Sequence, residues 1–184
     1  MRIYAPAGTV ETLDRLLAEP EIAEAVVTHR VLPEREAQVA PFPDWLDKRI
    51  VRGLHGQGIE MLYTHQAEAL AALREGKDIV VVTPTASGKS LCYGLPVLQA
   101  VADDPAARAL FLFPTKALSQ DQLAAFRELS GQAEIDVVAG VYDGDTPGPI
   151  RTNIRSAGQV VVTNPDMLHS AILPHHTKWF QLFE

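Results

Sequence analysis

The run Thr83-Pro84-Thr85-Ala86-Ser87-Gly88-Lys89-Ser90 constrains the fold of this chain more than any other feature. It follows residues 78–83, an apolar stretch that predicts a strand buried on both faces of a sheet. It opens residues 88–102, whose pattern predicts a helix. A strand that turns through Gly-Lys-Ser into a helix is the context of a phosphate-binding loop, because backbone N–H groups and the helix dipole favour negative charge there. The sequence therefore predicts an α/β domain with a phosphate site.

The side chains of this loop have the chemistry that a bound nucleotide requires. We expect Lys89 to reach the β- and γ-phosphates and the Ser90 hydroxyl to coordinate Mg²⁺, which makes these two the candidate catalytic residues. Thr83 stands where the pattern G-x-x-x-x-G-K-[ST] has its first glycine, so the strict pattern fails at one residue. The alternative is a Gly-Lys-Ser helix start that binds nothing. The candidate phosphate-binding residues are Thr83, Pro84, Thr85, Ala86, Ser87, Gly88, Lys89 and Ser90.

Strand-like and helix-like segments alternate from about residue 59 to the end of the sequence. The alternation predicts right-handed βαβ units and a doubly wound parallel sheet with helices on both faces. Further strands are expected over residues 109–113, 136–141 and 159–163, and further helices over residues 115–129, 150–156 and 165–172. The preceding part is different: helices over residues 9–17, 20–27 and 44–54 and a proline-containing connector over residues 31–43. We therefore divide the chain into a helical extension, residues 1–58, and an α/β domain, residues 59–184.

Composition excludes several classes of protein. The 184 residues are enough for one domain with a sizeable core, and no apolar run approaches the ~18 residues of a membrane-spanning helix. Cys92 is the only cysteine, so we expect a cytoplasmic protein without an internal disulfide and without a membrane partner. The net charge of −7 argues mildly against a nucleic-acid partner, because such proteins are usually basic.

Four further segments give the phosphate loop a specific setting. Residues 62–66, Leu-Tyr-Thr-His-Gln, resemble the Q motif of superfamily-two helicases, and residues 113–122 resemble their motif Ia. Residues 142–146, Tyr-Asp-Gly-Asp-Thr, resemble the segment after the third strand in these motors, and residues 163–169 resemble motif Ib. Together with the loop, they make the chain similar to the first RecA-like lobe of a DEAD/DEAH-box helicase.

This resemblance implies ATP and Mg²⁺ as cofactors, with Gln66 bonded to the adenine edge and Tyr63 packed near the base. It also implies a nucleic-acid partner, held by its backbone through hydroxyls, amides and helix N-termini rather than through a broad basic face. Ordinary turn and capping chemistry is the alternative for these residues. The implied contacts are Pro114, Thr115, Lys116, Gln120, Gly144, Asp145, Thr146, Thr163, Asn164 and Pro165.

A narrower resemblance extends over residues 27–184. The lead-in residues 31–37, Pro41-Phe42-Pro43 and the loop tail Ser90-Leu91-Cys92-Tyr93 are similar to the mitomycin repair factor branch, which has a C-terminal zinc-binding module. That branch implies an ATP-dependent DNA helicase of 3′→5′ polarity that serves DNA repair.

The family's Asp-Glu-x-His tetrad does not occur in this sequence, and neither does a second motor lobe. We therefore expect an N-terminal fragment whose partners are single-stranded or partly duplex DNA and the missing C-terminal part of the same protein. Alone, such a piece would bind nucleotide weakly and would not unwind a duplex. The alternatives are the lobe of an RNA helicase, a non-motor P-loop module and, more remotely, a small-molecule kinase.

Overall fold

The computed structural model describes residues 8–30, 36–85 and 87–183, and its contacts divide the chain into two compact units, residues 1–36 and 37–184. The first unit contains helices α1 (Thr9–Ala18) and α2 (Pro20–Ala25). Pro20 occupies the first position of α2, where its missing N–H costs nothing. Neither helix has a buried residue. The two predicted helices of this region are thus confirmed, and α2 ends at Ala25 rather than at residue 27.

The second unit begins with a short hairpin and two helices. Strand β1 (Val39–Ala40) pairs antiparallel with β2 (Leu62–Tyr63), and helices α3 (Lys48–Gly56) and α4 (Thr64–Arg74) follow β1 and β2 respectively. Asp47 caps α3 by accepting a 2.7 Å hydrogen bond from Arg49 N. Ile50 and Leu54 of α3 are fully buried in the main core. Residues 37–58 therefore pack within the second unit.

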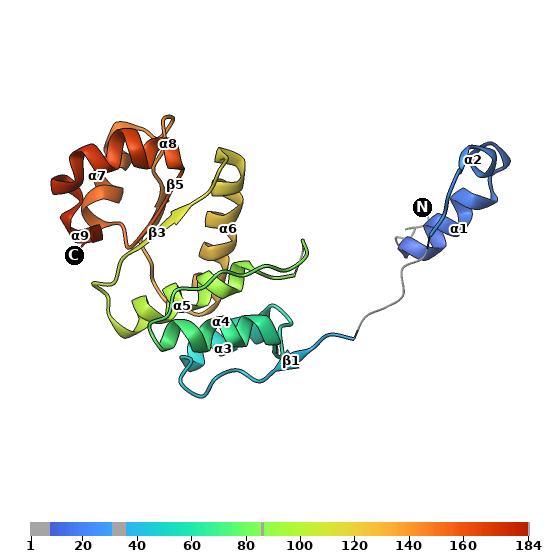
Figure 1. Ribbon diagram of the computed structural model, residues 1–184, viewed down its shortest axis with the longest axis horizontal. Helices are drawn as coiled ribbons and strands as arrows, with labels where there is room; N and C mark the ends of the chain where they lie inside the picture. Colours follow the sequence, from blue (N-terminus) through green and yellow to red (C-terminus); the bar gives the residue numbers. More distant parts are fainter. Residues whose placement is uncertain (1–7, 31–35, 86, 184) are drawn as a thin grey trace, which may run out of the picture. The chain divides into compact units, whose positions relative to one another are not determined.

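A parallel sheet in the order β3-β5-β4 forms the centre of this unit (Figure 1). Its strands are β3 (Ala109–Leu112), β4 (Ala139–Val141) and β5 (Val160–Thr163). Val160 and Val162 belong to the main core, which also contains residues of α5 (Ser90–Asp103) and α6 (Lys116–Gln132). Val161 points to the other face, in a second cluster with Ile154 of α7 (Gly148–Ala157). Helices cover both faces of the sheet, which confirms the predicted architecture.

After β5, the chain continues through short helical segments. These are α8 (Pro165–Met167), the π-helical turn η1 (Leu168–Ile172), the 3₁₀ segment η2 (Leu173–Trp179) and α9 (Phe180–Phe183). The predicted helix over residues 165–172 is therefore helical throughout but is not one regular α-helix. Within the described residues, no helix combines the length and the apolar character needed to cross a membrane.

The predicted buried strand over residues 78–83 is wrong for this structure. The segment between α4 and α5 has no strand partner among the described residues, and Val80 and Val82 are 90% and 88% exposed. Ile79 and Val81 are half-buried and line a depression that Ala69 and Ala72 of α4 share. A strand requires hydrogen bonds to a neighbour, and the sheet places none beside this segment.

Candidate nucleotide and nucleic-acid site

The phosphate loop depends on Gly88, which has a φ of +72°. This left-handed conformation favours glycine. A Cβ at this position would also lie 2.5 Å from Nε2 of Gln66, closer than real Cβ contacts allow. Gly88 therefore has two separate reasons to be glycine, its backbone conformation and the close approach of the Gln66 amide, which a 2.9 Å hydrogen bond holds to Gly88 O.

The ammonium of Lys89 is turned into the loop. It donates hydrogen bonds to the carbonyl oxygens of Thr83 (2.9 Å) and Pro84 (2.6 Å). The hydroxyls of Thr83 and Ser87 lie 2.5 Å apart, so the residue that replaces the first glycine of the general pattern closes the loop on itself. A cation held by neutral oxygen atoms can exchange these acceptors for phosphate oxygens, which form stronger charge-assisted bonds. The loop therefore fits a phosphorylated ligand.

Ser90 begins α5, a 14-residue helix, and this helix start is the other half of the candidate phosphate site. The positive end of the helix dipole lies at this helix start, where Leu91 N and Cys92 N donate hydrogen bonds to the carbonyl oxygens of Gly88 (3.1 Å) and Lys89 (3.0 Å). No group of three or more His, Cys, Asp and Glu side chains that could hold a metal exists in the part of the chain that the structure describes. The predicted loop residue Ala86 lies outside the described residues.

Gln66 connects α4 to this loop. Its side chain is 2% exposed, its Oε1 accepts a 2.8 Å hydrogen bond from Tyr63 N, and its Nε2 donates a 2.9 Å bond to Gly88 O. Tyr63 is 42% exposed and stacks on His65, with ring centroids 5.7 Å apart. The structure thus brings both predicted adenine-site residues to the phosphate loop. Contact with adenine itself stays a prediction.

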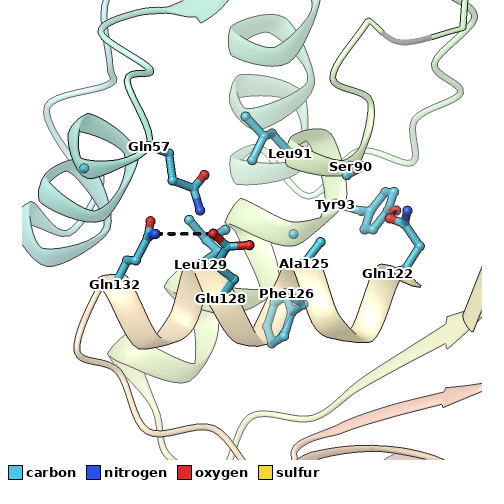
Figure 2. Close-up of a pocket in the computed structure, with 12 residues that line it drawn as sticks. Gln57, Ser90, Leu91, Tyr93, Gln122, Ala125, Phe126, Glu128, Leu129 and Gln132 are labelled. Carbon is cyan, nitrogen blue, oxygen red and sulfur yellow. Dashed lines mark hydrogen bonds between the residues drawn. The ribbon is translucent and has the colours of Figure 1, made fainter. Parts of the chain in front are cut away.

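A cavity of about 450 Å³ lies beside Ser90, between the end of α3, α5 and α6 (Figure 2). Its walls include the apolar side chains of Leu91, Phe126 and Leu129. Burial raises the pKa of the Tyr93 phenol, whose hydroxyl donates a 2.5 Å bond to Oε1 of Gln122 on α6. The lining residues of the cavity include no cation for a phosphate, whereas the loop carries the ammonium of Lys89.

A cleft of about 590 Å³ between α6, β4 and α7 collects several of the predicted nucleic-acid contacts. Lys116 and Gln120 line it from α6, and Asp145 and Thr146 line it from the turn after β4. Lys116 and Asp145 form an ion pair, and the hydrogen bond from Lys116 to this carboxylate raises the pKa of the Lys116 ammonium. The charges of motif Ia and of the Gly-Asp-Thr segment therefore meet across the cleft.

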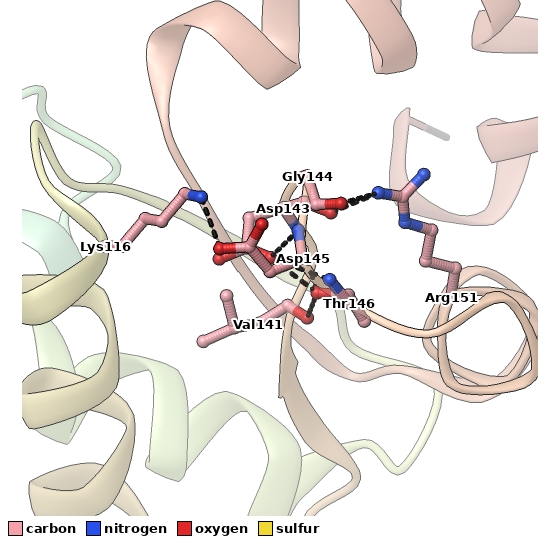
Figure 3. A network of polar contacts seen from close by, with 7 residues as sticks. All are labelled: Lys116, Val141, Asp143, Gly144, Asp145, Thr146 and Arg151. Carbon is pink, nitrogen blue, oxygen red and sulfur yellow. Dashed lines mark hydrogen bonds and ion pairs between the residues drawn. The ribbon is translucent and has the colours of Figure 1, made fainter.

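A network of polar contacts fixes the turn 143–146 (Figure 3). The buried carboxylate of Asp143 accepts hydrogen bonds from Asp145 N (3.0 Å), Thr146 N (3.0 Å) and Thr146 Oγ1 (2.9 Å). Thr146 Oγ1 also lies 2.9 Å from the carbonyl oxygen of Val141. The Thr146 hydroxyl is thus occupied within the protein. Sequence reasoning did not assign Asp143 to this role, although an aspartate before Gly-Asp-Thr is a typical turn signal.

The remaining predicted contacts are not brought into this cleft. Thr163 is 1% exposed, and its hydroxyl donates a 2.6 Å bond to Tyr142 O, so it joins the ends of β5 and β4 inside the protein. Thr115 caps α6 and Asn164 caps α8, which is the capping chemistry of the alternative interpretation. Pro114, Gly144 and Pro165 are exposed.

Comparison with solved structures places this geometry among helicases. A crystal structure of the DUF1998 helicase MrfA bound to DNA and AMPPNP has 56% sequence identity to this chain and a TM-score of 0.79, covering 81% of this chain and 21% of MrfA. A second MrfA crystal structure, bound to DNA, has 50% sequence identity and a TM-score of 0.81, covering 97% of this chain and 25% of MrfA. The predicted resemblance to the mitomycin repair factor branch is therefore confirmed.

Curated sequences agree with the structures. The ATP-dependent helicase YprA of Bacillus subtilis is 52% identical over 174 residues, which cover 95% of this chain and 23% of YprA. The ATP-dependent helicase HRQ1 of Saccharomyces cerevisiae is 36% identical over 182 residues, which cover 96% of this chain and 17% of HRQ1. The chain spans less than a quarter of the length of either relative. The family model for DEAD/DEAH box helicases matches residues 63–183, and the chain belongs to this family.

Proposed function

We propose that this chain forms the ATP-binding part of the first motor lobe of an ATP-dependent DNA helicase that acts in DNA repair with 3′→5′ polarity. The observation that carries the proposal is the loop 83–90, with a left-handed Gly88 tied to Gln66 and a lysine held by replaceable carbonyls. The phosphate-binding residues and the residue assigned to adenine therefore lie in one connected site.

The proposed cofactors are ATP and Mg²⁺. Lys89 would exchange its carbonyl partners for phosphate oxygens, Ser90 would supply a hydroxyl ligand for Mg²⁺, and Gln66 would hold the adenine edge. Bound Mg²⁺ would neutralise the charge of the phosphates. The chain has no Asp-Glu-x-His tetrad to position an attacking water, so we propose that these 184 residues alone bind nucleotide weakly and do not unwind DNA.

The proposed partner is single-stranded or partly duplex DNA, together with further residues of the same protein. The cleft that contains Lys116 and Gln120 supports a backbone contact, and the MrfA structures named above contain DNA. RNA is the second candidate, because contacts to a phosphate backbone carry little information about the sugar.

A DNA-stimulated ATPase assay of a protein extended to the length of its relatives tests this function. We expect hydrolysis that single-stranded DNA accelerates more than single-stranded RNA does, and that Lys89→Ala abolishes. Lys77→Ala is the matched control, because Lys77 is an exposed lysine paired with Glu75. Stronger stimulation by RNA would favour the RNA alternative, and full activity in Lys89→Ala would refute the phosphate-loop assignment.

A non-motor nucleotide-binding module is the alternative function, because these 184 residues contain no Asp-Glu-x-His tetrad. Such a module would bind ATP and show no turnover that depends on nucleic acid. The same assay separates the two functions.

A further inference from the structure

One side chain of α7 reaches the turn 143–146. Nη2 of Arg151 donates hydrogen bonds to the carbonyl oxygens of Asp143 (2.6 Å) and Gly144 (2.8 Å), as Figure 3 shows. These carbonyls belong to the first two residues of the turn. Hydrogen bonds from a charged donor are stronger than those between neutral groups. Arg151 is therefore a firm connection between α7 and the turn.

Buried aromatic rings hold Arg151 in this position. Its guanidinium lies over the ring of Tyr142, 5.6 Å from the centroid, and Tyr142 packs edge-to-face on Trp179 at 4.8 Å. Both rings are buried, at 6% and 2% exposure. Nε of Arg151 is buried and has no hydrogen-bond partner within the described residues. This placement costs desolvation of the guanidinium, which the cation–π contact and the two carbonyl bonds offset.

The turn is held from two sides. Asp143 accepts from the N–H groups of Asp145 and Thr146, and Arg151 donates to the two carbonyls that precede them. Asp145, the third residue of the turn, forms an ion pair with Lys116 across the cleft. Arg151 thus bonds to the backbone of the turn that carries Asp145, although it touches neither side chain of the pair in the described contacts.

We propose that Arg151 is a positioning residue for nucleic-acid binding. It fixes the backbone of turn 143–146 so that this turn and Lys116 face the strand, and it does not contact the strand itself. This inference rests on the proposed function, because nucleic acid is the ligand of the cleft. It concerns a residue that no motif of the sequence singled out.

Amide hydrogen exchange tests the positioning role without any nucleic acid. In Arg151→Gln we expect faster exchange at Asp145 and Thr146, with the helical amides of α7 still protected. Arg155→Gln is the matched control: Arg155 lies one turn further along α7 and makes no side-chain hydrogen bond or ion pair to the described residues. Arg151→Lys, which keeps a charged donor, should restore part of the protection. Exchange at Asp145 and Thr146 equal to that of the unaltered chain would overturn the proposal.

Affinity measurements on the same variants test the functional consequence. For Arg151→Gln we expect roughly threefold to tenfold weaker binding of a labelled oligothymidylate, the effect of losing about one net hydrogen bond. Binding of a fluorescent ATP analogue should not change. Equal losses for both ligands would indicate a merely structural role and overturn the proposal.

Salt dependence separates positioning from direct contact. Removing a residue that binds phosphate directly reduces the magnitude of the slope of log affinity against log salt by about 0.7 on a single strand. We expect Arg151→Gln to keep the slope of the unaltered chain, and a slope reduced by that amount would contradict the positioning role. Failure of a protein extended to the length of its relatives to bind DNA would refute the proposed nucleic-acid function, and the exchange result would then decide the positioning of the turn separately.

Discussion

Nε2 of Gln66 donates a hydrogen bond of 2.9 Å to the carbonyl oxygen of Gly88. Because Gln66 is almost fully buried and also binds Tyr63 N, this contact makes the first turn of α4 and the phosphate loop one connected unit. The resemblance assigns Gln66 to the base and the loop to the phosphates. We therefore expect changes at either residue to affect binding of the whole nucleotide.

Gly88→Ala tests this contact. The new Cβ would lie 2.5 Å from Nε2 of Gln66, in a residue with a φ of +72°. We therefore expect the free energy of unfolding to fall by about 1–2 kcal/mol and an ATP analogue to bind about tenfold more weakly. Gly76→Ala is the control, because Gly76 has a φ of +74° but a Cβ added there would meet no heavy atom within 4 Å. Equal effects of the two substitutions on nucleotide affinity would show that backbone strain alone matters.

Gly53→Ala tests the close approach of α3 to the end of α6. A Cβ there would lie 3.0 Å from Ala133 N and 3.1 Å from the carbonyl carbon of Gln132, so we expect about 1–3 kcal/mol of destabilisation in urea unfolding. Gly56→Ala, in the same helix, meets no atom within 4 Å and should leave stability unchanged or raise it by up to ~1 kcal/mol. Similar unfolding midpoints for the two variants would contradict this packing.

Asp47 should make stability depend on pH. Its hydrogen bonds from Arg49 hold the pKa of the Asp47 carboxyl below its ordinary value. The contribution of the Asp47 charge to the free energy of unfolding is therefore complete above the unfolded pKa of about 4. It is lost as the pH falls through the folded pKa. We expect Asp47→Ala to lose about 1 kcal/mol at neutral pH and less near pH 3. Asp47→Asn keeps a neutral acceptor, so its unfolding free energy should fall less on acidification. A constant difference between the unaltered chain and Asp47→Ala at all pH values would refute the role of the charge.

The sheet and its helices were largely predictable because their signals are local. The apolar run over residues 159–163 predicts a strand, and the structure forms β5 there with all of its residues buried. Thr163 is the last residue of this buried strand, although the resemblance implied that it contacts nucleic acid. Residues 78–83 have an equally apolar pattern, but a strand also requires a neighbour, which no local pattern supplies.

The contacts that organise the candidate site were not predictable in the same way. Arg151 reaches Asp143 and Gly144 from another element, and Gln66 reaches Gly88 across 22 positions of sequence. Spacing within a helix or a turn predicts which residues share a face, but it does not predict which distant carbonyl group a side chain will bind. The motif pattern gave the residue types of the site, and the tertiary packing determined their partners.

Binding of a fluorescent ATP analogue with Mg²⁺ to this chain tests the central claim most directly. We expect weak, saturable binding that Lys89→Ala abolishes without changing the unfolding midpoint, because the hydrogen bonds of the Lys89 ammonium go to its own loop. Lys77→Ala, which alters a lysine paired with Glu75, should bind like the unaltered chain. Equal affinity of Lys89→Ala and the unaltered chain would contradict the assignment of residues 83–90 as the phosphate site.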